Sequence, residues 1–430
     1  MIKSFKIKLL PNNKQRTRLF QFAGAARFAY NWVLDKQMTN FRNGIKLQNN
    51  YELRKEFTVF RNLPENSWLL EISNNVTKQA VKDCYDAYSK FFRKQKTKGY
   101  VKYGKKKIEH FARIGRKLTV YDMNGHPKFK SKKNGDFNFY QDTDKIKFTK
   151  THVKFENIAK SRRKNRKKAN WIKLAERGKI PINAKYKNPR ITFDGIDWWI
   201  SVGINIKRSL KPMRNLKVLK ITKKCREGLG IDLGIKDLAI CSDKSTIKNI
   251  NKSYTIRRLK RKRRRLQRQV SRKYQMNKKG ESYRKTSNII KSEKKLLRIN
   301  RKLANIRHNH LHQATTAIIK RKPSFICLED LNVKGMMSNK HLSEATQEQK
   351  FYEFRRQIEY KAKWAKIPVI IANRYFPSSK TCIRCGKVKK DLKLSDRIYQ
   401  CECGNIIDRD FQAALNLKLY GEEQLKKSVC

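Results

Sequence analysis

The sequence is short of acidic residues, and this shortage dominates its composition. Of 430 residues only 35 are Asp or Glu, against 106 Lys or Arg, which gives a formal net charge of +71. A small domain needs a net charge of only about 2–8 to stay soluble. An excess this large destabilises a compact chain by self-repulsion unless a polyanion neutralises it. The composition therefore predicts a standing nucleic-acid partner, with a basic structural protein, such as a ribosomal one, as the alternative.

Long hydrophobic runs are also missing. No run of about 18 apolar residues occurs, which argues against a membrane span, and Met1–Ser4 leads into a short alternating segment rather than a signal peptide. The apolar fraction of 38%, with 10% aromatic residues, is still enough to form hydrophobic cores. We therefore expect a folded chain of about three domains without a membrane partner.

Cysteines are few, and four of the nine are clustered. The cluster reads Cys382-x2-Cys385, then fifteen residues, then Cys401-x-Cys403, a spacing close to that of a zinc ribbon. Four thiolates would make a closed, structural site, and disulfides are the alternative. The other five cysteines are scattered, mostly in apolar contexts, which is typical of reduced, buried thiols in a cytoplasmic protein.

The amino-terminal 220 residues predict a small β-barrel interrupted by helices. Residues 2–10 alternate apolar and basic side chains, as a strand with one exposed face does. Apolar residues recur at helical spacing over 14–37 and 75–93, and their aromatic side chains are expected to form a core rather than a base-stacking surface. The cluster Arg162–Lys168 is either a solvated loop or a phosphate contact, and the net charge favours phosphate. The later strands that we expect are Lys145–Phe148, Arg190–Phe193, Trp198–Ile204 and Leu216–Ile221.

Residues 251–310 concentrate positive charge on a helical pattern. They hold 23 Lys or Arg and two acidic residues, Glu281 and Glu293. Apolar residues keep helical spacing beneath the charge, which predicts two long helices joined near Asn277–Gly280. A solvated face is the alternative to the wall of a nucleic-acid channel, which the one-sided charge favours.

Two carboxylates are predicted on strands of a further domain. Alternation puts Ile231 and Leu233 on one face of a strand and Asp232 on the other. Asp is depleted in strands and costly to bury unpaired, so Asp232 either belongs to a site or is paired, for example with an Arg. The apolar run before Glu329 predicts a buried strand that ends at this acid, where open α/β sheets hold their sites. Asp330 is expected to point away and to be exposed.

A third carboxylate follows the cysteines. Asp408 has the position of a helix N-cap, whereas Asp410 lies in the first turn, on the small apolar face of that helix. We therefore expect Asp410 to point toward Asp232 and Glu329. Three gathered carboxylates repel one another, so two Mg²⁺ or Mn²⁺ ions are predicted between them, suited to phosphodiester hydrolysis. A purely structural role is the alternative.

Together these motifs resemble the TnpB family, insertion-sequence-encoded, RNA-guided nucleases related to the compact type V CRISPR effectors. The specific motifs cover roughly residues 225–417 and end in the segment Asp408–Ala414, in which Gln412 stands where the family more often has Asn. The resemblance implies catalytic metal ligands at Asp232, Glu329 and Asp410. It implies one structural Zn²⁺ bound by Cys382, Cys385, Cys401 and Cys403.

The resemblance also implies a multidomain fold of α+β and α/β type. Its parts are a β-barrel wedge domain with an inserted helical recognition domain, a RuvC-like nuclease domain of the RNase H fold, and a zinc ribbon. The implied boundaries are 1–13 and 99–222 for the wedge domain, 14–98 for the recognition domain, 223–377 and 407–430 for the nuclease domain, and 378–406 for the ribbon.

The function implied by the resemblance is RNA-guided, Mg²⁺-dependent cleavage of double-stranded DNA beside a short target-adjacent motif. The guide RNA would come from the end of the transposon and supply sequence specificity by base pairing. A transposase of the same element is a further implied partner. Two alternatives remain: a non-catalytic RNA-guided DNA-binding protein that represses its target or regulates transposition, and a basic RNA-binding structural protein.

Overall fold

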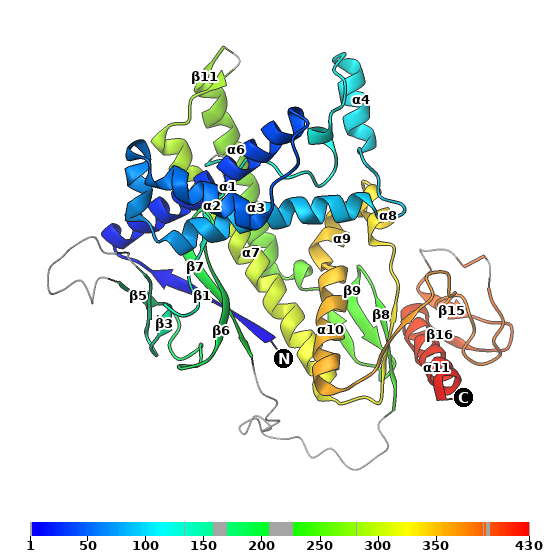
Figure 1. Cartoon of the computed structure of the whole chain (residues 1–430). Helices are drawn as coiled ribbons and strands as arrows, with labels where there is room; N and C mark the ends of the chain where they lie inside the picture. The colour runs from blue at the N-terminus through cyan, green and yellow to red at the C-terminus, as the bar shows by residue number, and fades with distance from the viewer. Residues whose placement is uncertain are drawn as a thin grey trace. The chain divides into compact units, whose positions relative to one another are not determined.

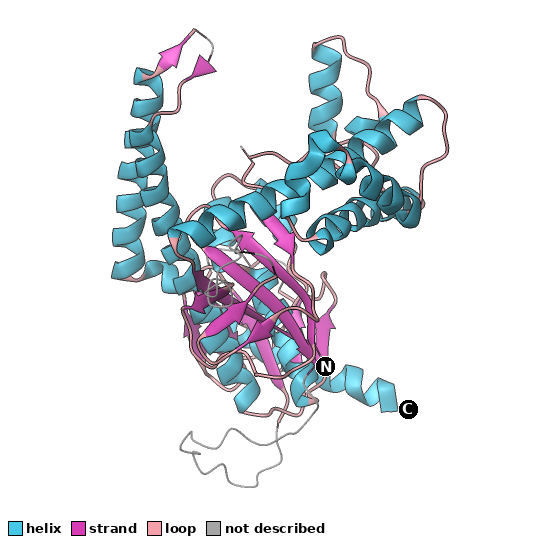
Figure 2. Ribbon diagram, turned by 60° about the vertical axis from the view of Figure 1, so that its left-hand side comes forward, coloured by secondary structure: helices cyan, strands magenta, loops and turns pink. Residues whose placement is uncertain are grey.

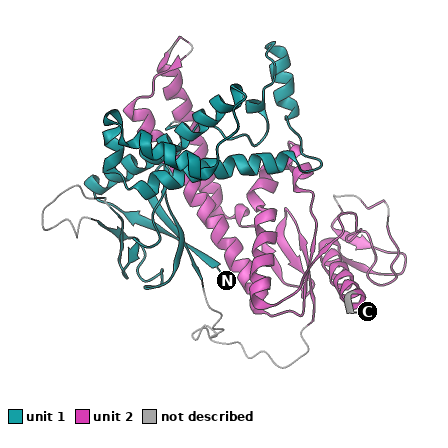
Figure 3. Ribbon diagram, in the orientation of Figure 1, with its two compact units in different colours: residues 1–214 teal, residues 215–430 magenta. Residues whose placement is uncertain are grey.

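The computed structural model describes residues 2–132, 134–156, 158, 170–205, 227–280, 282–389, 391–392 and 396–429. The chain divides into two compact units, Met1–Arg214 and Asn215–Cys430 (Figure 3). The expected strand Leu216–Ile221 and the basic cluster Arg162–Lys168 lie outside the described residues.

The first unit is built on a seven-stranded antiparallel sheet in the order β2-β6-β7-β1-β5-β4-β3. Strands are drawn in magenta in Figure 2. The amino-terminal strand β1 pairs with β7 from Ile2 opposite Asn205 to Leu9 opposite Trp198, which confirms that residues 2–10 join the later strands. The sheet has two edge strands, β2 and β3, and its closure into a barrel stays a prediction. The strands are β1 Ile2–Leu10, β2 Asn138–Tyr140, β3 Lys147–Phe148, β4 His152–Lys154, β5 Trp171–Leu174, β6 Tyr186–Phe193 and β7 Trp198–Asn205.

Helices of the first unit share one hydrophobic core with this sheet. Asn12 and Gln15 form a reciprocal capping box that starts α1, which continues past the predicted end. Of the predicted aromatic core, Phe22 is buried, whereas Phe92 is 38% exposed. The helices are α1 Asn13–Arg42, α2 Asn50–Asn62, η1 Pro64–Glu71, α3 Asn74–Gln95, α4 Lys105–Arg113 and η2 Val120–Asp122, of which α1 and α3 match the two predicted helices.

The second unit contains a five-stranded mixed sheet in the order β10-β9-β8-β13-β14. β13 is parallel to both β8 and β14, whereas β8, β9 and β10 are antiparallel neighbours. The predicted strands around Asp232 and before Glu329 are thereby confirmed as adjacent central strands. The bounds are β8 Leu229–Leu233, β9 Asp237–Cys241, β10 Thr246–Lys248, β13 Ile326–Glu329 and β14 Val369–Ala372.

Helices cover both faces of this sheet. Figure 1 shows α7 (Ser287–Lys320) and α10 (Phe351–Ala365) on one side of β8 and β9, and α11 (Arg409–Val429) on the other. Ile231 and Leu233 belong to the core formed with α7 and α10. Because side chains alternate along a strand, Asp232 lies on the opposite face, which α11 covers.

The basic region is a pair of long helices, as predicted. α6 (Tyr254–Met276) packs on α7 through a small apolar core that includes Leu259 and Leu303. Between the two helices lies a short hairpin, β11 Lys278–Lys279 and β12 Ser282–Tyr283. No helix within the described ranges is long and apolar enough to span a membrane. The remaining elements are η3 Ile250–Lys252, α8 Val333–Ser338, α9 Ser343–Gln349, β15 Ile398–Gln400 and β16 Ile406–Asp408.

Candidate active site and metal centre

Asp232 and Glu329 lie at the carboxyl ends of two neighbouring parallel strands. Leu328 of β13 is the register partner of Ile231 of β8. One step further along both strands, Glu329 comes opposite Asp232, across the roughly 4.7–4.9 Å that separates adjacent strands. Both side chains are half-buried. Phe325 and Cys327, which share the face of Glu329, pack with Leu417 of α11, so both acids face that helix.

A glycine lets α11 approach this face closely. A Cβ atom added at Gly230 would lie 2.0 Å from the carbonyl oxygen of Ala414 and 2.5 Å from the backbone nitrogen of Lys418. Asp232 follows Gly230 by two residues on the same strand face, and Asp410 precedes Ala414 by one helical turn. The contact at Gly230 therefore brings Asp410 toward Asp232.

The three acids interact electrostatically. Burial raises the pKa of Asp232 to about 8, with further contributions from the charges of Glu329 and Asp410, against a lowering effect of Arg409. Burial, followed by the charge of Asp330, also raises the pKa of Glu329. The three carboxylates are thus neighbours but not a compact group. Of the described residues, only the four clustered cysteines bring at least three ligand atoms within 4.8 Å of one another.

Asp408 and Asp410 have different environments, as predicted. The carboxylate of Asp408 accepts hydrogen bonds from the backbone N–H groups of Asp410, at 3.0 Å, and Phe411, at 2.9 Å, so it caps α11. Asp410 is contacted by two guanidinium groups, Arg409 at 3.3 Å and Arg397 at 3.9 Å. Arg397 escaped the sequence-based prediction because a single Arg thirteen residues before Asp410 gives no periodic signal.

The expectation that Asp330 is exposed is wrong. Its side chain is 29% exposed, and its two oxygens accept from Arg355 and Arg374, each at 2.7 Å. A cavity of about 460 Å³ lies beside these groups, with Glu329 and Tyr352 in its lining. Charge pairing with side chains 25 and 44 residues later in the chain holds Asp330 at the surface of this cavity.

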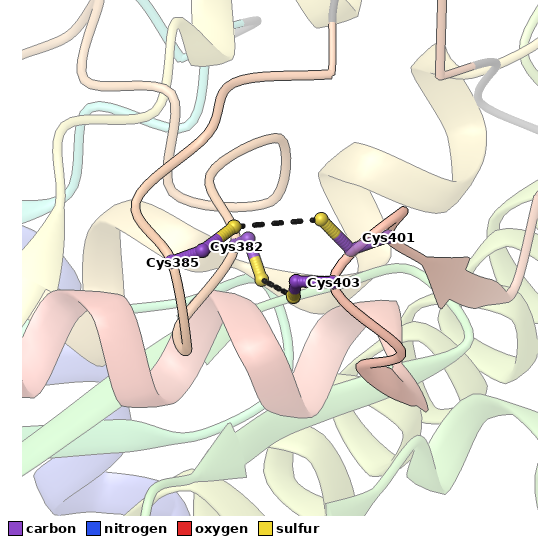
Figure 4. A group of neighbouring side chains, drawn as sticks. All are labelled: Cys382, Cys385, Cys401 and Cys403. Carbon is purple, nitrogen blue, oxygen red and sulfur yellow. Dashed lines mark hydrogen bonds between the residues drawn. The ribbon is translucent and has the colours of Figure 1, made fainter.

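The four clustered cysteines converge as a metal site would require. Figure 4 shows two close pairs, Cys382 with Cys403 and Cys385 with Cys401, and the Sγ atoms of each pair are 3.6 Å apart. This exceeds the roughly 2.0 Å of a disulfide and is close to the edge of about 3.8 Å expected of a tetrahedron with Zn–S bonds of about 2.3 Å. Burial raises the pKa of Cys382, but N–H groups of Cys385 and Arg384 and the neighbouring thiols outweigh it and lower that pKa to about 6, whereas the pKa of Cys403 is raised, so Cys382 is the thiol of this pair that ionises first.

Two side-chain amides fasten this cluster to α11. Asn416 donates from Nδ2 to the carbonyl oxygens of Ser378 and Thr381, each at 2.7 Å. Asn405 donates to Oε1 of Gln412 at 3.0 Å and lies 3.5 Å from Sγ of Cys382. Gln412 is fully buried, and its hydrogen bond with Asn405 links the cysteine cluster to the helix that carries Asp410.

Three family domains match the chain in succession. Residues 1–46 match a "Helix-turn-helix domain" and residues 216–340 a "Probable transposase" domain, both of the IS605 OrfB type. Residues 351–417, which include the cysteine cluster, match a "Cas12f1-like, TNB domain".

Similar proteins extend over nearly the whole chain. InsQ of Escherichia coli (strain K12) is 24% identical over 418 residues, which cover 93% of this chain and 87% of InsQ. A protein of Streptomyces pristinaespiralis is 24% identical over 430 residues, which cover 100% of this chain and 90% of that protein. Both relatives carry the name "Putative RNA-guided DNA endonuclease". Among solved structures, the mini-RNA-guided endonuclease CRISPR-Cas_phi3 aligns with a TM-score of 0.49 and 11% identity, covering 97% of this chain and 92% of its own.

Proposed function

The chain carries, in order, domains of the IS605 OrfB, or TnpB, proteins, and from this relationship we propose that it is an RNA-guided DNA endonuclease of an insertion sequence. It would cleave double-stranded target DNA beside a short motif, with a guide RNA from the transposon end that selects the target by base pairing. A transposase of the same element is a further proposed partner. The cytoplasm is the proposed location.

The observation that carries this proposal is that Asp232 and Glu329 lie at the ends of adjacent strands, on the sheet face covered by α11, whose first turn contains Asp410. Burial raises the pKa of Asp232, and the charges of Glu329 and Asp410 raise it further, so this carboxylate is costly to ionise without a cation; oxygen ligands suit Mg²⁺ or Mn²⁺. The mixed sheet with acids at the ends of two central strands supports a RuvC-like nuclease domain of the RNase H type.

Each residue of the site has a proposed task. Asp232, Glu329 and Asp410 would hold two Mg²⁺ or Mn²⁺ ions, which supply an activated water and stabilise the leaving oxygen of the phosphodiester. Asp408 fixes the start of α11, and Arg397 and Arg409 orient the carboxylate of Asp410 until metal binds. The cysteine cluster would hold one Zn²⁺ in a closed, structural site with no open coordination position.

Plasmid cleavage by the protein co-purified with its RNA tests the proposal. We expect cleavage of a plasmid that carries the guide-matched target in Mg²⁺, and none from Asp232→Ala. Asp243→Ala is the matched control, since Asp243 lies beyond the opposite end of β9, where it pairs with Arg321. Equal cleavage by Asp232→Ala would show that the site is misassigned.

The same experiment separates the two alternatives. Target binding without cleavage in saturating Mg²⁺ indicates a repressor or transposition regulator. Nicking that does not depend on a divalent metal, with no guide-dependent binding, indicates a basic structural RNA-binding protein. Sequencing of the co-purified RNA identifies the guide, and the absence of bound RNA would overturn the proposal.

A further inference from the structure

The first unit contains a cavity of about 750 Å³ for which the proposed nuclease chemistry has no use. It lies between α1, η1 and the segment before β2, and these three parts come from distant stretches of the chain. A cavity of this size falls in the range of small-ligand sites, about 300–1,000 Å³. The lining residues that matter here are Phe20, Phe28, Trp68, Phe137, Arg27 and Lys132.

Two pairs of aromatic rings line the cavity. Phe28 contacts Trp68 edge to face at a centroid distance of 5.3 Å, and Trp68 is 44% exposed. Phe20 contacts Phe137 in the same manner, also at 5.3 Å. Phe20 and Phe28 are eight residues apart on α1, which is about 12 Å along the helix axis. A flat ring in contact with a ring on each side would need these rings only about 7–8 Å apart, so a base can stack on one of the two aromatic pairs and not on both.

Between the two aromatic pairs, α1 has a glycine that no close neighbour requires. Gly24 lies midway between Phe20 and Phe28, and a Cβ atom added there would meet no atom within 4 Å. Glycine in the interior of a helix costs roughly 0.8–1 kcal/mol relative to alanine. Since no neighbour requires the missing side chain, its effect is to keep the cavity open.

Positive groups lie at the cavity. Nη1 of Arg27 is buried and has no hydrogen-bond partner in the part of the chain that the structure describes, and the guanidinium lies 5.7 Å from the ring of Phe137. A buried donor without a partner is costly, so it calls for an acceptor from outside the protein. Lys132 is exposed at the rim, where it can meet a phosphate.

We propose that this cavity binds one unstacked nucleobase of a single-stranded nucleic acid. The base stacks on the pair formed by Phe28 and the exposed Trp68, a base carbonyl or ring nitrogen accepts from Arg27, and the adjoining phosphate pairs with Lys132. Stacking on aromatic side chains is the usual means of holding single-stranded bases. The inference rests on the proposed nucleic-acid partners but not on the catalytic carboxylates. Guide RNA and an unpaired strand of target DNA carry the same chemistry.

Photocrosslinking of the full-length, RNA-loaded protein tests the inference. One arm uses the co-purified RNA and ultraviolet light, and a second adds target DNA that contains 5-bromouracil. We expect a nucleotide adduct on the peptide that contains Trp68 in at least one arm. An adduct in the RNA arm assigns the base to the guide, and one in the DNA arm assigns it to the target. The adduct should persist in Asp232→Ala, so that loss of cleavage and loss of base binding are measured separately.

Substitution of Gly24 provides the matched comparison. Gly24→Leu fills the cavity and is expected to remove the adduct and to weaken binding of that strand roughly tenfold to a hundredfold, the loss of one stacked base. Gly24→Ala, with a thermal midpoint at least as high as the parent, should keep both. Trp68→Phe should bind better than Trp68→Ala. Absence of the adduct from both arms, or its persistence in folded Gly24→Leu, overturns the proposal.

Discussion

Asp408 and Asp410 are separated by one residue, yet backbone N–H groups surround one carboxylate and arginines surround the other. Asp408→Ala removes the cap of α11 and should lower the free energy of unfolding by about 0.5–2 kcal/mol, with cleavage retained. Asp410→Ala should keep the cap and lose cleavage. Thermal unfolding and plasmid cleavage, measured on both variants, check this prediction. Loss of cleavage from Asp408→Ala alone would reverse the two roles.

The raised pKa of Asp232 predicts a pH dependence of stability in the metal-free protein. The folded pKa is about 8 and the ordinary value 3.8, so folding favours the protonated acid. Its stabilising contribution is complete below about pH 4 and is lost as the pH rises through 8. Asp232→Asn stays neutral, so its thermal midpoint should exceed that of the parent by a margin that grows from pH 5 to pH 8.

Magnesium provides the complementary measurement for Asp232. Because Mg²⁺ binds the ionised carboxylate, it should raise the midpoint of the parent at pH 8 and leave that of Asp232→Asn nearly unchanged. Midpoints of parent and variant that run parallel over this pH range in the absence of metal would contradict the assigned environment of Asp232.

Residue-scale features differed in how far the sequence could predict them. Strand alternation and a capping position are local patterns. They were enough to predict on which face of its strand Asp232 lies and that Asp408 caps α11. The ion pairs of Asp330 with Arg355 and Arg374 depend on how β13 meets distant segments, so the expected exposure was wrong. The ligand roles of Asp232, Glu329 and Asp410 stay predictions.

At the scale of elements, the distance between α11 and β8 depends on Gly230. Gly230→Ala places a methyl group against the backbone of α11, which cannot yield as a side-chain end does. We expect a loss of about 1–3 kcal/mol in the free energy of unfolding, with cleavage lost because Asp410 moves away from Asp232. Gly104→Ala is the control, since a Cβ atom there meets nothing within 4 Å. Full cleavage by a folded Gly230→Ala would contradict this account.

The cysteine cluster predicts one zinc ion per chain. Elemental analysis should find it in the parent and not in Cys403→Ser, whereas Cys84→Ser, which removes a buried thiol of the first unit, should keep it. Zinc removal should also reduce cleavage, because Asn405 and Gln412 connect the cluster to α11. Undiminished cleavage by a zinc-free variant would show that the cluster does not position this helix.

Elements with strong periodicity, such as α1, α3, α6 and α7, could be predicted from the sequence. The helix α2 was not predicted, although Leu53, Phe57 and Phe60 keep helical spacing and Asn49 and Glu52 form a capping box at its start. Pairing partners such as β1 with β7 are a matter of long-range register, which the alternation within one strand does not contain.

For the whole molecule, the net charge of +71 predicts nucleic-acid binding that depends steeply on salt. α6 contains no acidic residue and exposes a row of arginines on its surface. Arg261→Gln with Arg265→Gln should weaken RNA binding and reduce the slope of log affinity against log salt by about 0.7–0.9 for each phosphate that the variant no longer neutralises. The matching Arg→Lys variant keeps the charge and should keep the slope. Titration at several KCl concentrations measures both, and an unchanged slope would place the RNA elsewhere.

Composition alone thus predicted the class of partner, since charge is a property of the whole chain. It could not predict the aromatic cavity of the first unit, whose walls join Phe20, Trp68 and Phe137 across more than a hundred residues. Nor could it divide the chain into its two units, and the five domain boundaries implied by the resemblance stay predictions.

The close contact of α11 with β8 also has a consequence during protein synthesis. Asp410 leaves the ribosome 178 residues after Asp232, which takes roughly 10–35 s at about 5–20 residues per second. Throughout that time the nascent chain contains most of its basic residues but lacks the third carboxylate. If the proposed function holds, a chain that engages RNA while it is still being translated does so before its three carboxylates can come together.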